Sequence, residues 1–169
     1  MEFPQIRRAE RDVLLRFLTA EEWPFHVRPK LAPDDVRDRF EKGEFTDAFW
    51  IVDDGAKTGL VRLMELDDGA PQFDLRIAAA ARGRGLGEAT VRWLTEHVFT
   101  NYATNRIEAT TRDDNHAMRR VLTKTGYVKE AHYRDAWPAA GGLHDSIGYA
   151  ILRGDWQTGT TTPVNWADE

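Results

Sequence analysis

The sequence predicts an α/β fold of the α+β kind, in which helices flank a mixed, mostly antiparallel central sheet. Three strand-like runs follow one another closely in the first half of the chain, which is typical of an antiparallel meander. The hydrophobic period then changes to that of helices, and helices alternate with strands up to a final pair of strands. Because this order does not repeat as a βαβ array, it favours a mixed sheet covered by helices.

The first half of the chain should contain two helices and then the three strands. Val13, Leu14, Phe17 and Leu18 share one helical face, so we expect a helix over residues 9–19. Pro33 suits a first helical position because its φ angle is fixed, and we expect the second helix to run from there to Gly43. The Asp-Gly pairs at 54–55 and 68–69 are typical of hairpin turns and predict strands at 48–52, 60–66 and 73–78.

The second half should alternate helices with strands. Apolar residues at helical spacing predict a helix from Leu86 to about Phe99. A strand over 106–111 and a helix over 115–125 follow, and Gly126 is a typical helix stop. We expect the last two strands at 127–136 and 143–153, with the segment 138–142 between them.

Composition limits both the architecture and the chemistry. The chain has 169 residues and a formal net charge of -5, which disfavours a nucleic-acid or anionic-membrane binder. It contains no cysteine, so a thiolate metal site and a cysteine nucleophile are excluded, and we expect no metal. We expect one domain over 1–156, an irregular tail over 157–169, no signal or membrane segment, and a cytoplasmic location.

The most informative segment is a glycine loop between a predicted strand and a predicted helix. Residues 82–87 read Arg-Gly-Arg-Gly-Leu-Gly. Glycines expose the backbone N–H groups, and the helix N-terminus adds partial positive charge, so the loop is suited to bind phosphate or pyrophosphate. The dinucleotide pattern fails because Glu88 stands in place of its third glycine, and no Gly-Lys-Ser/Thr of a P-loop is present. Taken alone, the loop is equally compatible with an ordinary strand-to-helix turn.

Several ordered motifs make the sequence resemble the GNAT N-acetyltransferase superfamily. The Arg-x-x-Gly-x-Gly loop, lying between a strand and a helix, is similar to that family's acetyl-CoA pyrophosphate loop. The later family motifs are matched by 106–110, by Asn115-x-Ala117 and by Lys124-Thr125-Gly126-Tyr127. Residues 134–137, Asp145 and 149–153 resemble its ribosomal-protein alanine acetyltransferase-like branch. The resemblance runs from about residue 49 to 156 and implies the GNAT fold.

The resemblance implies acetyl-CoA as co-substrate and direct attack of an amine on its thioester. It implies that the pyrophosphate is held by the loop residues, which are Arg82, Gly83, Arg84, Gly85, Leu86 and Gly87. It further implies that Ile77 and Ala78 pair with the pantetheine arm and that Asn115 hydrogen-bonds the cofactor, although Asn115 also suits a helix cap. A backbone N–H near Ile77 is a candidate for stabilising the oxyanion.

The chain departs from the commoner family pattern at its acid and its base. Leu122 stands where many members have a tyrosine that protonates the thiolate, and Gln72 falls near their glutamate base. Gln72 cannot act as a base, but Asp74 and Arg76 share its strand face, so Asp74 is the first candidate base and His26 is a second. A structural Asp74–Arg76 pair, and catalysis by proximity without a dedicated base, stay open as alternatives.

Acceptor pockets in this family form from the loop between the first two helices and from the last strands. The candidates for the acceptor side are therefore Trp23, Phe25, Arg76, Asp135 and Trp137. The expected acceptor is a small-molecule amine or a peptide N-terminus, and a homodimer is left open. Two alternatives to acetyl transfer remain, namely transfer of a longer acyl group and a catalytically weak CoA-binding sensor or interaction module.

Overall fold

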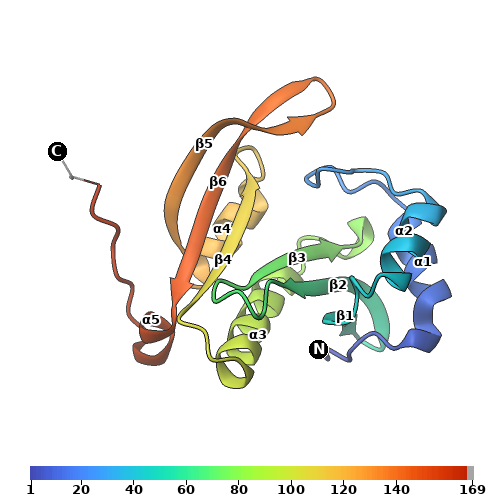
Figure 1. Ribbon diagram of the computed structural model, residues 1–169, viewed down its shortest axis with the longest axis horizontal. Helices are drawn as coiled ribbons and strands as arrows, with labels where there is room; N and C mark the ends of the chain where they lie inside the picture. Colours follow the sequence, from blue (N-terminus) through green and yellow to red (C-terminus); the bar gives the residue numbers. More distant parts are fainter. Residues whose placement is uncertain (167–169) are drawn as a thin grey trace. The chain divides into compact units, whose positions relative to one another are not determined.

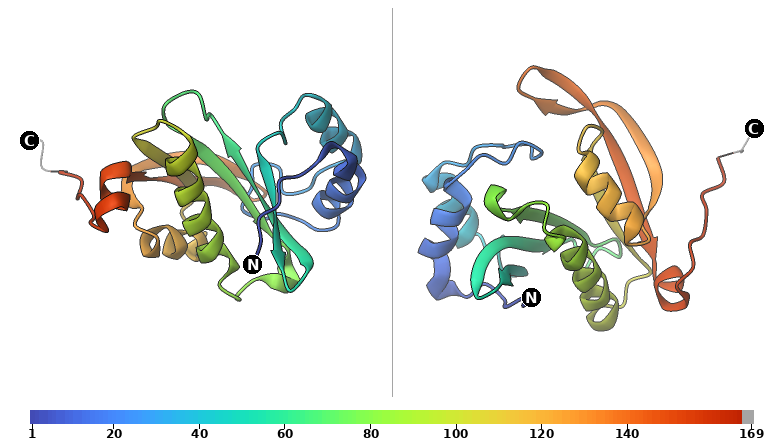
Figure 2. Two further views of the ribbon diagram at one scale, coloured as in Figure 1. Left: turned by 90° about the horizontal axis from the view of Figure 1, so that it is seen from below. Right: turned by 180° about the vertical axis from the view of Figure 1, so that it is seen from behind.

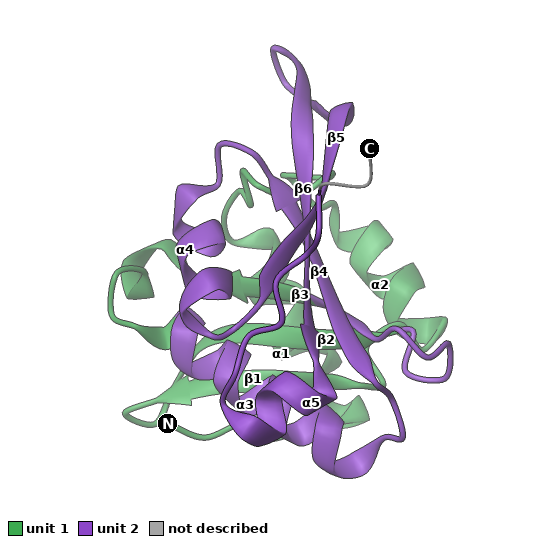
Figure 3. Ribbon diagram, turned by 90° about the vertical axis from the view of Figure 1, so that its left-hand side faces the viewer, with its two compact units in different colours: residues 1–64, 74–86 green, residues 65–73, 87–169 purple. Residues whose placement is uncertain are grey.

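In the computed structural model, residues 1–64 and 74–86 form unit 1, and residues 65–73 and 87–166 form unit 2 (Figure 3). The structure describes residues 1–166. Residues 167–169 of the predicted tail lie outside the described residues. Among the helices of the described chain, none is long and apolar enough to cross a bilayer.

Unit 1 is built on a three-stranded sheet of order β1-β2-β3 (Figure 1). Its strands are β1 (Ala48–Asp53), β2 (Ala56–Met64) and β3 (Gln72–Ile77), of which the first two residues of β3 belong to unit 2. Strands β1 and β2 pair antiparallel, with Trp50 opposite Leu60. Asp54 and Gly55 join them with φ angles of 50° and 75°, as the predicted hairpin turn requires.

Two helices cover one face of this sheet and close a hydrophobic core. The helices are α1 (Arg11–Thr19), which the short 3₁₀ helix η1 (Arg8–Glu10) precedes, and α2 (Pro33–Glu41). They agree with the predicted helices to within two residues. The buried core draws on these helices, on the strands and on the segments next to them. It is made of Ile6, Leu14, Leu18, Trp23, Leu31, Val36, Phe45, Ala48, Trp50 and Leu60.

Gly59 lets two strands of unit 1 approach closely. A Cβ atom at this position would lie 2.5 Å from the carbonyl oxygen of Arg76 and 2.9 Å from Cδ1 of Ile51. We therefore expect Gly59→Ala to lower the free energy of unfolding by about 1–3 kcal/mol, because backbone and core must shift to admit the methyl group. Denaturant unfolding measures this, with Gly154→Ala as control, since a Cβ at Gly154 meets nothing within 4 Å. Equal denaturant midpoints of unfolding for Gly59→Ala and Gly154→Ala would contradict the close approach of the strands at Gly59.

Unit 2 is built on a second three-stranded sheet, of order β4-β6-β5. Its strands are β4 (Arg106–Arg112), β5 (Val128–Ala139) and β6 (Gly142–Leu152), and both pairings are antiparallel. Its helices are α3 (Leu86–Asn101), whose first residue belongs to unit 1, α4 (His116–Lys124) and α5 (Arg153–Thr158). Helix α4 lies along the sheet (Figure 2). Arg119 Nε on this helix donates to the hydroxyl of Tyr149 on β6.

The structure differs from the predicted elements in three places. The strands form two sheets of three rather than one central sheet. The β5–β6 hairpin continues through Pro138 and Ala139, because Gly141 and Gly142, at φ angles of 98° and 143°, confine the turn to residues 140–141. The predicted tail begins in α5, which ends at Gly159 in the left-handed conformation, and 159–166 is irregular.

Candidate functional site

The glycine loop of residues 82–87 follows β3 in unit 1 and leads into α3. Gly83 and Gly85 have φ angles of 77° and 80°, a backbone conformation that residues other than glycine rarely adopt. A Cβ at either position would meet no atom within 4 Å, so the loop surface at both glycines is open. Leu86, which is buried, starts the 16-residue helix α3. The exposed loop therefore precedes the positive end of a long helix dipole, as an anion site requires.

Both loop arginines are exposed and are held by neighbouring groups of unit 1. Arg84 Nη2 lies 2.5 Å from Asp53 Oδ2. Arg82 Nε donates to the carbonyl oxygen of Ile77 at 3.0 Å, and its Nη2 lies 3.4 Å from Glu21 Oε2. Exposed ion pairs of this kind are weak, so an incoming phosphate can replace the carboxylates.

The end of β3 presents backbone groups along a sheet edge. The N–H of Ala78 donates to the carbonyl oxygen of Thr58 on β2. Because neighbouring residues of a strand direct their amides to opposite sides, the N–H of Ile77 faces away from β2, along the edge that β3 forms in this sheet. The N–H of Ala79 is taken by Glu21, whose two carboxylate oxygens lie 3.0 and 3.1 Å away. Sequence reasoning missed Glu21, since a lone loop carboxylate carries no motif.

The structure brings together three of the predicted residues on unit 1, namely His26, Asp74 and Arg76. His26 Nε2 lies 2.8 Å from Asp74 Oδ1, and Arg76 Nε and Nη2 each lie 3.3 Å from Asp74 Oδ2. Burial disfavours the charge of Asp74, but the His26 hydrogen bond and the charges of Arg76 and Arg62 outweigh it. They hold the pKa of Asp74 well below its usual range. Asp74 is therefore a firmly ionised acceptor.

An ionised Asp74 fixes the chemistry of His26. Since a carboxylate only accepts hydrogen bonds, Nε2 of the imidazole carries the proton that it shares with Asp74. In the neutral imidazole, Nδ1 then carries the lone pair, and this atom is buried and has no hydrogen-bond partner among the described residues. The depressed pKa makes Asp74 itself a weak base, so the unused lone pair at Nδ1 of His26 is the more basic site of the pair.

Arginines from neighbouring elements surround the pair. Arg62 on β2 and Arg39 on α2 share Glu44, with contacts of 3.3 and 2.8 Å, and Arg62 also stabilises the charge of Asp74. Burial lowers the pKa of both Arg62 and Arg76, and Asp74 opposes that effect in each case. Arg76 Nη1 and Arg62 Nε are buried and have no hydrogen-bond partner in residues 1–166.

The two aromatic residues of unit 1 that were predicted for the acceptor side differ in exposure. Trp23 is 1% exposed, and its indole N–H donates to the carbonyl oxygen of Leu18. Its ring lies 5.5 Å from the guanidinium carbon of Arg76 and 6.4 Å from the centre of the His26 ring. Trp23 therefore supports the cluster from the core and does not line an open pocket. Phe25 is half-buried in the same loop.

The remaining predicted residues lie on unit 2. Gly87 is in the first turn of α3. Asn115 caps α4: its Oδ1 accepts from the N–H of Met118, and its Nδ2 donates to Thr111 Oγ1. Asp135 and Trp137 lie on β5, at an irregularity in its pairing with β6, where the N–H of Asp135 donates to Asp145. The indole N–H of Trp137 is buried without a partner among the described residues.

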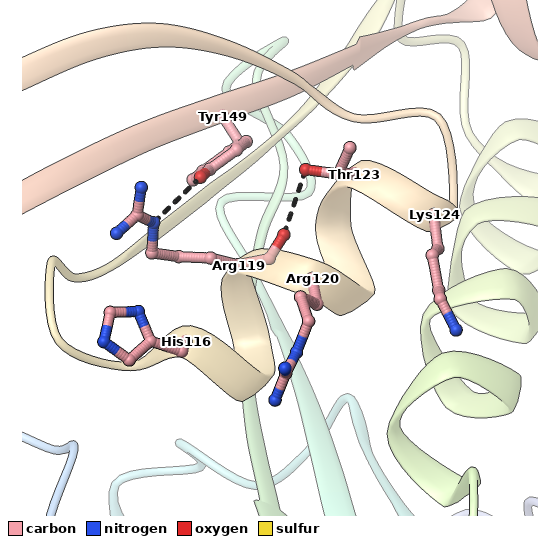
Figure 4. Close-up of a pocket in the computed structure, with 6 residues that line it drawn as sticks. All are labelled: His116, Arg119, Arg120, Thr123, Lys124 and Tyr149. Carbon is pink, nitrogen blue, oxygen red and sulfur yellow. Dashed lines mark hydrogen bonds between the residues drawn. The ribbon is translucent and has the colours of Figure 1, made fainter.

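A cationic face on α4 was missed by the sequence reasoning. His116, Arg119, Arg120 and Lys124 line a pocket of about 470 Å³, together with Thr123 and Tyr149 (Figure 4). No carboxylate lines this pocket. The basic residues recur at helical spacing, so this signal was present in the sequence and could have been read as an anion-binding face.

One acidic cluster on unit 2 has ligand atoms close enough for a metal ion. Donor atoms of Asp113, Asp114 and His144 lie within 4.8 Å of one another. Arg112 donates to both carboxylate oxygens of Asp114, at 2.8 and 2.5 Å, so these oxygens are already neutralised.

Comparison with known proteins extends these observations. Residues 2–128 match the family model described as an acetyltransferase (GNAT) domain. YdaF of Bacillus subtilis (strain 168), whose name places it provisionally among ribosomal N-acetyltransferases, is 27% identical over 109 residues. That alignment covers 63% of this chain, and it spans 60% of the length of YdaF.

Solved structures share the fold at lower identity. The Vibrio cholerae spermidine N-acetyltransferase in complex with CoA and spermine is 17% identical, with a TM-score of 0.79, over 92% of this chain and 97% of that one. RimL, a ribosomal L7/L12 alpha-N-protein acetyltransferase in complex with coenzyme A, is 16% identical, with a TM-score of 0.77, over 89% of this chain and 92% of that one. These structures confirm the predicted fold class.

Proposed function

Because this chain belongs to the acetyltransferase (GNAT) family, whose members use acetyl-CoA to acetylate amines, we propose that it transfers the acetyl group of acetyl-CoA directly onto a primary amine. The observation that carries the proposal is the open glycine loop of 82–87, with Gly83 and Gly85 at positive φ in front of α3. The acceptor is a small-molecule amine or a protein N-terminus. Residues 1–156 act as one acetyltransferase domain.

The residues of the loop fit a pyrophosphate. A side chain at Gly83 or Gly85 would fill the open surface of the loop, and Arg82 and Arg84 supply positive charge beside it. The edge amide of Ile77 suits the pantetheine arm or the developing oxyanion. Asn115 can bind the cofactor through a remaining lone pair while it caps α4.

Acetyl-CoA supplies the activated acetyl thioester, and the protein supplies the base. His26 accepts a proton from the attacking amine at Nδ1, while Asp74 holds Nε2–H and stabilises the imidazolium that forms. The predicted candidates Asp74 and His26 thus act as a positioning residue and a base, respectively. Leu122, at the position of the family's tyrosine acid, is fully buried and apolar and cannot donate a proton. The leaving thiolate therefore takes its proton from the imidazolium or from water.

Thiol release from acetyl-CoA tests the proposed function. We expect at least one amine in a panel of amino acids, spermidine, an aminoglycoside and N-terminal peptides to raise the rate and to gain one acetyl group by mass spectrometry. Longer acyl-CoA donors in the same assay show whether the acyl site admits more than acetyl. Tight acetyl-CoA binding without turnover on any amine would instead support a CoA-binding sensor.

Arg120 on α4 provides a prediction for cofactor binding. It lies in the cationic pocket, and its exposed side chain makes no hydrogen bond or ion pair with another described residue, so the guanidinium is available to a phosphate. We expect Arg120→Glu to weaken acetyl-CoA binding about 10-fold at low salt, and less at high salt, because screening reduces exposed charge interactions. Calorimetric titration measures this, with Arg16→Glu on the exposed surface of α1 as control. Equal affinities for the two variants would show that the α4 pocket does not bind acetyl-CoA.

A further inference from the structure

The cluster around Asp74 holds more positive than negative charge. Arg39, Arg62 and Arg76 contribute three cations, whereas Asp74 and Glu44 contribute two anions, so one cation is in excess while His26 is neutral. Two of these cations are well buried, since the side chains of Arg76 and Arg62 are 6% and 15% exposed. An uncompensated buried cation is unfavourable unless a further anion approaches it.

The excess charge coincides with unused hydrogen-bond donors. Arg76 uses Nε and Nη2 on Asp74 and leaves Nη1 buried without a partner in the described chain. Arg62 donates from Nη1 to Glu44, and its Nε is likewise buried without a partner among the described residues. Buried donors are nearly always satisfied in folded proteins, and each exception calls for an explanation such as a catalytic role or a bound water or ion. Both unused donors belong to the cations that surround Asp74.

The proton acceptor and the unused arginine donor are held by one carboxylate. Asp74 binds the imidazole of His26 through Oδ1 and the guanidinium of Arg76 through Oδ2, and Trp23 packs against both groups. Of the three residues that meet at this carboxylate, His26 is the most exposed, with 23% of its side chain accessible against 15% for Asp74 and 6% for Arg76. Nδ1 of His26 and Nη1 of Arg76 are thus two buried polar atoms, without a partner among the described residues, on side chains that bind the same carboxylate.

We propose that the acceptor carries a carboxylate close to its amine, and that Arg76 binds this carboxylate and so determines specificity. The acceptor is thus an amino acid or an amino-acid-like compound, and a polyamine is disfavoured because its charges meet three arginines. A peptide N-terminus would offer a neutral carbonyl group in place of the carboxylate. This inference rests on the proposed function, because it concerns the acceptor of the same reaction.

The test compares amino acids with their own carboxamides as acceptors. For each pair, kcat/KM is measured with the wild type and with Arg76→Gln. The ratio of kcat/KM for the amino acid to kcat/KM for its carboxamide is then compared between the two proteins. This double ratio removes the difference in basicity between the two amines. We expect Arg76→Gln to lower the ratio about 10- to 100-fold, as expected for loss of a charge-assisted hydrogen bond. Arg16→Gln, which removes the same charge from the exposed surface, should leave the ratio unchanged.

The remaining outcomes separate this inference from the proposed function. If Arg76→Gln does not fold, Arg62→Gln removes one charge from the same cluster and should also lower the ratio. An unchanged ratio in the folded variant, or faster turnover of spermidine than of every carboxylate acceptor by the wild type, would overturn the inference while the acetyltransferase stands. Failure of every amine to release thiol would contradict the proposed function itself.

Discussion

Replacing His26 by asparagine should lower kcat about 10²- to 10⁴-fold, the range that a positioned general base contributes. The physical reason is the position of the proton. Asp74 is held ionised and takes Nε2–H, so Nδ1 is the basic atom that asparagine cannot replace. Affinity for acetyl-CoA should remain near that of the wild type, because the glycine loop is unchanged. Steady-state kinetics with the best acceptor, together with calorimetric titration of acetyl-CoA, measures both quantities.

The pH profile separates a base from a merely structural histidine. A general base must be unprotonated to act, so kcat/KM of the wild type should fall toward acidic pH, and this acidic limb should disappear in His26→Asn. Asp74→Asn should lower kcat as well, because a neutral amide cannot stabilise the imidazolium. His97→Asn, at a histidine stacked on Trp93 in α3, serves as the control. If His26→Asn keeps the acidic limb and most of kcat while Asp74→Asn loses both, Asp74 is the base.

Local signals predicted the elements of the fold well, whereas strand pairing could not be predicted. The Asp54-Gly55 turn and the α4 stop at Gly126 depend on residues that adopt positive φ, and such residues are visible in the sequence. The division into two three-stranded sheets depends on contacts between distant segments. No local pattern shows that β6 pairs with both β4 and β5.

The candidate site could also be predicted only where its residues are neighbours in sequence. The glycine loop is contiguous, so its residues and their spacing predicted an anion site directly. The partnership of His26 with Asp74 joins positions 48 residues apart, and the sequence offered them only as two separate candidates. The charges of Arg62 and Arg39 reach the cluster from β2 and α2 through tertiary packing. The His26 hydrogen bond and the charges of Arg76 and Arg62 lower the pKa of Asp74 and thereby favour His26 as the base, which the sequence alone left open.

Gly85→Glu should weaken acetyl-CoA binding about 10²- to 10³-fold. The variant forces a residue other than glycine into a φ angle of 80°, which stores strain of about 1–3 kcal/mol in the loop or displaces it. It also places a carboxylate where the pyrophosphate should bind, and this removes or repels a charge-assisted contact of about 1.5–3 kcal/mol. Calorimetric titration with acetyl-CoA measures the change in affinity.

Gly69→Glu is a matched control for this prediction. Gly69 has a φ angle of 76°, is exposed, and offers open space to a Cβ, so the substitution introduces the same side chain into the same backbone conformation. It lies in the turn between β2 and β3, away from residues 82–87 in sequence. Its affinity for acetyl-CoA should equal that of the wild type. A loss as large as that of Gly85→Glu would indicate general damage to the fold.

Gly85→Lys separates the two causes of the expected loss. It carries the same strain as Gly85→Glu but reverses the charge, so it should bind acetyl-CoA more tightly than Gly85→Glu does, because lysine attracts the phosphates. Equal losses for the two variants would show that backbone conformation alone controls binding at this position. Unchanged affinity in both would mean that the pyrophosphate binds elsewhere. In that case the positive φ angles of Gly83 and Gly85 would serve only the turn from β3 into α3.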